Sequence, residues 1–173
     1  FEAHNNLGIT FQFFGKMDLA LDCYKKAIRI KPNFLDAQIN LGVILTEMGK
    51  LSEAKSCLRK AISIDSGSAK AHNSLGNVFK DQGSLMEAES AYKRAIEIQP
   101  NFAMAFNNLG IVSYANGNLD DSIKSLKKAY SIKPESKLLL SVIGAKKSHA
   151  RSSSSSPKNL KANERLKANP LIL

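Results

Sequence analysis

Apolar and small side chains recur along the first 136 residues at the three- and four-residue spacing of one helix face. The first two sets are Ala3, Leu7, Phe11, Phe14 and Ala20, Tyr24, Ala27, Ile28. Similar sets continue down the chain, separated by short segments that contain glycine, proline or serine. The pattern predicts eight helices, over residues 2–14, 18–31, 35–48, 52–65, 69–82, 86–99, 103–116 and 120–133.

The helical segments repeat with a period of 34 residues. The repeat is clearest in four tetrapeptides: Asn-Asn-Leu-Gly at 5–8, Ile-Asn-Leu-Gly at 39–42, Asn-Ser-Leu-Gly at 73–76 and Asn-Asn-Leu-Gly at 107–110. Three further columns keep the same register: Gly15, Gly49, Gly83, Gly117; Ala27, Ala61, Ala95, Ala129; and Pro32, Ser66, Pro100, Pro134. A fixed period of this length predicts helical hairpins that share a core by stacking. We expect repeats at 1–34, 35–68, 69–102 and 103–136.

Glycines inside the first helices indicate close helix packing, because each costs ~1 kcal/mol relative to alanine. We expect Gly8 and its equivalents to face the alanine columns of the second helices, so that the two backbones approach. Gly15 and its equivalents are expected to end the first helices in the left-handed conformation. N-caps of the second helices are expected at Asp18, Ser52 and Asp120.

These columns resemble the tetratricopeptide repeat family, whose pattern is an aromatic residue, Leu-Gly, Tyr, then Ala, Phe or Tyr, Ala and Pro. The resemblance covers residues 1–136 without a gap. It implies an all-α, right-handed superhelical solenoid of four helix–turn–helix repeats, with a C-terminal capping helix over 137–150. The repeats are most similar to those of O-linked N-acetylglucosamine transferases and of bacterial arrays of this family.

The net charge of +10 is unevenly distributed. Residues 1–136 carry 17 Lys and Arg against 14 Asp and Glu, whereas residues 137–173 carry eight against Glu164 alone. The Ser-rich segment 151–173 is expected to be a disordered basic linker, and we expect the chain to be a piece of a longer protein that continues beyond Leu173. No apolar run approaches 18 residues, which argues against a membrane span.

No constellation of catalytic or metal-binding residues is visible. His4, His72 and His149 are far apart and lack metal-ligand spacing. We interpret Cys23 and Cys57, which occupy the same column, as packing residues of a protein from a reducing compartment, the cytoplasm. We therefore expect no enzymatic activity within this chain, no cofactor and no metal.

The resemblance implies that the first helix of each repeat lines a concave groove. The residues expected to contact a bound chain there are Asn6, Asn40, Ser74, Asn108, Ile9, Phe13, Val43, Asn77, Ile111 and Tyr114. The asparagines form a ladder that Ser74 interrupts. An amide carries both donors and an acceptor, which matches a peptide unit, and the ladder resembles that of the O-linked N-acetylglucosamine transferases. Alternatively, these asparagines bond neighbouring helices or water.

We expect the partner to be another protein or a peptide segment. The groove positions carry Glu2, Asp36, Glu47 and Asp81 against Lys70 and Lys80, so nucleic acid, which needs a basic track, is not expected there. The leading hypothesis is a protein–protein interaction scaffold. Two alternatives stay open: a substrate-recruiting region of a modifying enzyme whose catalytic domain lies outside this chain, and an RNA-binding protein.

Overall fold

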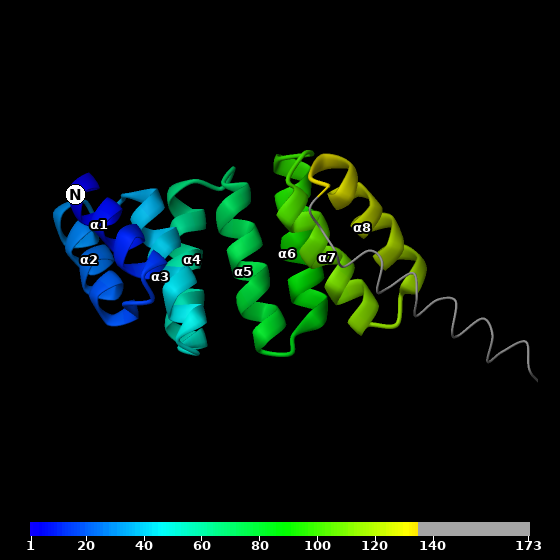
Figure 1. Ribbon diagram of the computed structural model, residues 1–173, viewed down its shortest axis with the longest axis horizontal. Helices are drawn as coiled ribbons and strands as arrows, with labels where there is room; N and C mark the ends of the chain where they lie inside the picture. Colours follow the sequence, from blue (N-terminus) through cyan, green and yellow to red (C-terminus); the bar gives the residue numbers. More distant parts are fainter. Residues whose placement is uncertain (135–173) are drawn as a thin grey trace, which may run out of the picture.

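The structure is a computed structural model, and it describes residues 1–134. Eight α-helices stand side by side in one row (Figure 1). They are α1 (Glu2–Phe13), α2 (Met17–Ile30), α3 (Leu35–Glu47), α4 (Leu51–Ile64), α5 (Ala69–Asp81), α6 (Leu85–Ile98), α7 (Ala103–Ala115) and α8 (Leu119–Ile132). All eight predicted helices are confirmed, and each boundary falls within one residue of its expected place. The expected capping helix and the Ser-rich linker lie outside the described residues.

Consecutive helices pair as antiparallel hairpins, and the hairpins stack in sequence order. The most extensive packing joins α1 to α2, α3 to α4, α5 to α6 and α7 to α8. The first helices α1, α3, α5 and α7 also pack on one another in turn, whereas the second helices share no comparable contact. The first helices are therefore closer together, and they form the inner side of a curved solenoid.

The glycine inside each first helix faces a large side chain, which corrects the expected packing of glycine against alanine. A Cβ added at Gly8 would lie 2.6 Å from Tyr24 Cε1, and one at Gly42 would lie 2.5 Å from Leu58 Cγ. Tyr92 and Leu126 occupy the same place over the glycines of the third and fourth repeats. The glycine is needed because the large side chain of the second helix lies directly on the backbone of the first.

The turn inside each hairpin begins as expected with a left-handed glycine. Gly15, Gly49, Gly83 and Gly117 have φ between 71° and 79°. The expected N-caps are wrong, because the second helices begin one residue earlier and leave Asp18, Ser52 and Asp120 inside the first helical turn. The N-cap residues are Lys16, Lys50, Ser84 and Asn118, none of which makes a capping bond with its side chain. The short turn after the glycine determines where the second helix begins, because the Lys16 N–H donates a hydrogen bond to Phe11 O at 2.9 Å.

The core is a continuous layer between the helices of successive hairpins. One cluster of buried side chains runs from the first repeat to the third and includes Tyr24, Ile44, Leu58 and Val78. Smaller clusters join the third repeat to the fourth. Within residues 1–134, no helix combines the length and the apolar character that crossing a membrane requires.

Candidate functional site

The residues predicted to bind a chain lie on the first helices, but they differ in exposure. On α3, α5 and α7, Asn40, Val43, Asn77, Asn108 and Ile111 are half-buried, and Ser74 is buried. The predicted residues near the two ends of the row are more open: Asn6, Ile9, Phe13 and Tyr114 are all exposed, Phe13 by 84%. The inner side therefore has polar, partly buried positions in its middle and exposed apolar side chains towards its ends. We call the surface formed by these ten residues the inner face.

The structure brings three of the predicted residues together in one pocket between α3 and α5. Val43, Ser74 and Asn77 line this pocket, whose volume is about 180 Å³. The other lining residues are Thr46, Glu47, Lys80 and Asp81. Glu47, Lys80 and Asp81 were expected in the groove from the sequence but were not counted among the residues that contact a bound chain. The pocket is polar and carries two carboxylates and one ammonium group.

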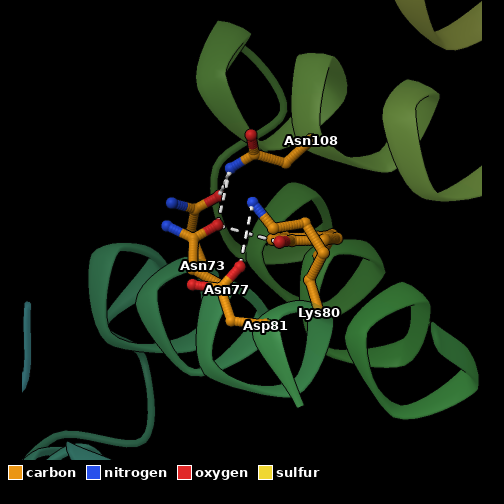
Figure 2. A network of polar contacts seen from close by, with 6 residues as sticks. Asn73, Asn77, Lys80, Asp81 and Asn108 are labelled. Carbon is orange, nitrogen blue, oxygen red and sulfur yellow. Dashed lines mark hydrogen bonds and ion pairs between the residues drawn. The ribbon is translucent and has the colours of Figure 1, made fainter. Parts of the chain in front are cut away.

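Asn108 is held by the preceding repeat through its amide nitrogen. Its Nδ2 donates to Asn73 Oδ1 and to Asn77 Oδ1, both at 3.1 Å. Asn77 Oδ1 also accepts from the hydroxyl of Tyr92 at 2.8 Å. Figure 2 shows this network between α5 and α7, with Oδ1 of Asn108 turned away from Asn73 and Asn77. The bonds fix the amide and leave its carbonyl oxygen pointing out of the network.

Asn40 is held in the same way by the first repeat. Its Nδ2 donates to Asn5 Oδ1 at 3.0 Å. A second chain of bonds lies nearby, where the Tyr24 hydroxyl donates to Gln12 Oε1 at 2.8 Å and Gln12 Nε2 donates to both carboxylate oxygens of Glu47. The alternative interpretation, that these asparagines bond neighbouring helices, is thus confirmed for their Nδ2 groups. Within residues 1–134, Oδ1 of Asn40 and Oδ1 of Asn108 accept no hydrogen bond.

The two tyrosines of these networks are buried and hydrogen-bonded. Burial raises the pKa of Tyr24 to about 12, and the nearby charge of Glu47 adds to the shift. Burial likewise raises the pKa of Tyr92, with a contribution from Asp81. Both hydroxyls therefore keep their protons at neutral pH and act as donors to the side-chain amides.

Matches to family models cover the whole repeat region. Tetratricopeptide repeat models match residues 1–34, 23–56 and 104–136, and a model described as TPR repeat matches 42–83 and 76–117. The chain belongs to the tetratricopeptide repeat family. Arrays of this family are protein-interaction modules.

Solved structures of tetratricopeptide repeat proteins share the fold. PilF of Pseudomonas aeruginosa is 22% identical, with a TM-score of 0.78 over 91% of this chain and 77% of that one. A thermophilic protein of Thermus thermophilus is 19% identical, with a TM-score of 0.76 over 95% of both chains. The first repeat domain of Spaghetti (RPAP3), solved with an HSP90 peptide, is 27% identical, with a TM-score of 0.63 over 66% of this chain and 91% of that one. No curated protein gives a significant match.

The histidines and cysteines of the tetratricopeptide repeats were the other residues considered for metal binding or redox chemistry. His72 Nε2 lies 3.1 Å from Ser66 O, and His4 is half-buried. Cys23 is buried and Cys57 half-buried, both as free thiols, and burial raises the pKa of the Cys57 thiol. Over residues 1–134 no group of three His, Cys, Asp or Glu side chains is arranged to hold a metal ion. His149 lies outside the described residues.

Sequence reasoning missed the buried asparagines Asn5 and Asn73 as partners of the ladder. They are 5% and 4% exposed, so they belong to the joints between repeats and not to the inner face. The signal was present in the alignment of repeats: each precedes by 35 residues an asparagine of the ladder. Ser74, which interrupts the ladder, is preceded at the same distance by Ile39.

Proposed function

We propose that this tetratricopeptide repeat array is a scaffold that binds an extended polypeptide along its inner face. Oδ1 of Asn40 and Oδ1 of Asn108 accept hydrogen bonds from backbone N–H groups of the bound chain. The observation that carries this proposal is the anchoring of both amides through Nδ2, which orients the carbonyl oxygens before a ligand arrives. Such preorganisation lowers the entropic cost of binding.

Apolar contacts provide much of the affinity. A net hydrogen bond contributes ~0.5–1.5 kcal/mol, whereas micromolar binding needs roughly 8 kcal/mol. The exposed side chains of Ile9, Phe13 and Tyr114 and the half-buried Val43 and Ile111 offer apolar surface beside the asparagines. A peptide ligand is also supported by the RPAP3 domain, which was solved with a bound peptide.

The pocket between α3 and α5 gives the bound chain a preferred side chain. Glu47, Lys80 and Asp81 line the pocket, and Lys80 Nζ lies 3.4 Å from Asp81 Oδ1. The carboxylate of Glu47 has no ion-pair partner within residues 1–134. A basic or amide side chain of the ligand fits this pocket better than an acidic one.

Peptide titration on two matched variants tests the proposal. Linear peptides selected from a random display library on the full chain are titrated against Asn108→Ala and Asn73→Ala. Asn108→Ala should weaken binding about 2- to 10-fold, since one acceptor is lost. Asn73→Ala removes a buried partner of the same network and should change affinity less than about 2-fold.

The outcome separates binding from stability. Equal loss of affinity in Asn108→Ala and Asn73→Ala would mean that Asn108 acts only through packing between repeats, and the ladder would be wrong as a binding site. Ile111→Asp places a charge on the inner face and should abolish binding of the selected peptides. Unchanged binding in that variant would exclude the inner face altogether.

A further inference from the structure

A second pocket lies away from the inner face, on the side of the second helices. It occupies about 690 Å³ between α6 and α8. Figure 1 shows these helices near the C-terminal end of the described row. Phe106, Leu109 and Ser113 of α7 form its floor, of which Leu109 and Ser113 are 8% and 3% exposed. We call this the outer pocket.

The floor of the outer pocket differs in sequence from the equivalent place in the third repeat. In the third repeat, Phe79 fills the corresponding place, and the Nζ of Lys55 lies 5.0 Å from its ring centroid. Both residues have equivalents 34 positions later: Phe79 becomes Ser113, and Lys55 becomes Glu89. Ser113 and Glu89 both line the outer pocket. The fourth repeat therefore has a hydroxymethyl group at the position where the third repeat has an aromatic ring.

The rim of the outer pocket is basic. Four lysines and two acids line it. Lys93 is paired with Glu89 at 2.7 Å, whereas Lys124, Lys127 and Lys128 form no ion pair within residues 1–134. The pocket thus combines an apolar floor with an excess of positive charge, which suits an apolar anchor that carries acidic neighbours.

Charge complementarity argues against two occupants from this chain itself. Residues 137–173 carry eight Lys and Arg against one Glu, so their charge does not complement the rim. A second copy carries a net charge of +10, which does not complement the rim either. The rim therefore favours a different and acidic molecule, and the apolar floor favours a polypeptide over a nucleic acid, whose phosphates would find only a short basic track.

We propose that the outer pocket binds an acidic peptide segment of a partner protein, with one apolar side chain on Phe106 and Leu109 and carboxylates at Lys124, Lys127 and Lys128. This site is separate from the inner face. The array can therefore hold two polypeptides at once, one on each side.

A fluorescein-labelled synthetic peptide of alternating Asp, Glu and Leu, titrated against the full chain by fluorescence anisotropy, tests the outer pocket. Ser113→Phe restores the side chain found at Phe79 and should weaken binding at least 10-fold by filling the floor. The combined change of Lys124→Glu and Lys128→Glu, both exposed, should also weaken binding at least 10-fold without a loss of folding. The matched control changes Lys26→Glu and Lys60→Glu, in the same column as Lys128, and should leave affinity within 3-fold.

Two comparisons complete the test. A peptide in which Gln replaces every acid should bind at least 10-fold more weakly, and Asn108→Ala should leave binding of the acidic peptide unchanged, which keeps this result independent of the inner face. If the control variant with Lys26→Glu and Lys60→Glu weakens binding equally, the effect comes from net charge alone and the proposal is overturned. Inorganic polyphosphate and vesicles with anionic lipids are tested as competitors of the peptide. If either competes and its binding is unchanged by Ser113→Phe, the proposal is overturned as well.

Discussion

The joint between the second and third repeats differs from the joints on either side of it. At the first and third joints, a ladder asparagine donates to a buried asparagine of the preceding repeat: Asn40 to Asn5, and Asn108 to Asn73. At the middle joint the corresponding residues are Ser74 and Ile39, which are 6% and 1% exposed. We call a joint polar where this pair of positions holds two asparagines and apolar where it holds Ile39 and Ser74. By this definition polar and apolar joints alternate within residues 1–134.

The alternation indicates that the ladder residue and the buried residue of the preceding repeat vary together. At the ladder position, an asparagine occurs where the preceding repeat supplies a buried amide as its partner. Where the preceding repeat supplies Ile39, the ladder position is Ser74. A buried amide without a partner costs about 1–3 kcal/mol, so the two positions must change together. The interruption at Ser74 has this physical cause.

The largest effect is expected from making the middle joint polar on one side only. Ile39→Asn removes a fully buried branched side chain and buries an amide opposite Ser74, and it should lower the free energy of unfolding by about 3–5 kcal/mol. Adding Ser74→Asn reproduces the pair seen at the other joints and should recover about 1 kcal/mol. Urea unfolding of both single variants and of the double variant gives the coupling energy. If the free energy of unfolding of the double variant equals the value expected from adding the two single changes, the two positions are not coupled and the explanation is wrong.

A smaller effect should distinguish the two polar joints from each other. Asn5→Ala leaves Nδ2 of Asn40 without any acceptor in residues 1–134, whereas Asn73→Ala leaves Asn108 bonded to Asn77. Asn5→Ala should therefore cost about 1–2 kcal/mol and Asn73→Ala less than 1 kcal/mol. Urea unfolding of the two variants under the same conditions measures the difference. The reverse order would show that Asn77 does not substitute for Asn73.

The fold was predictable from the sequence because its determinants repeat. The Leu-Gly and Ala columns and the left-handed glycines after each first helix appear four times in the same register, and all eight helices of residues 1–134 were predicted. The N-caps were not predictable in this way. Asp18 and Asp120 are good capping residues by type, but the backbone turn after Gly15 and Gly117 starts the helix one residue earlier. They remain in the first turn, where acids suit the helix dipole.

The inner face was predictable only in part. The positions of Asn40 and Asn108 followed from the family pattern, whereas their bonds join residues 35 apart across a repeat boundary. Such a bond depends on how the repeats stack, which a single helix face does not reveal. Likewise, the place of Tyr24 over Gly8 follows from the crossing of two helices and not from either sequence alone. The outer pocket required the stacking as well, because its walls come from two different repeats.

The smallest expected effect concerns the tyrosines that accompany the polar joints. Tyr24 and Tyr92 cover the glycines of the first and third repeats, whereas Leu58 and Leu126 do so in the second and fourth. Because burial raises the pKa of Tyr24 to about 12, above the usual value of about 10, the neutral hydroxyl is favoured in the folded state. This contribution to stability is complete below about pH 10 and is lost as the pH rises towards about 12.

A phenolate absorbance titration of the wild type and of Tyr24→Phe tests this difference between the repeats. The signal missing from the variant should belong to the late part of the curve, near pH 12, and not to the part near pH 10. Hydrogen exchange of backbone amides between these pH values should increase first in the first and third repeats, since only these repeats place an ionisable group over the glycine. If the missing signal instead titrates near pH 10, the Tyr24 hydroxyl is open to solvent, and its bond to Gln12 does not restrain the first repeat.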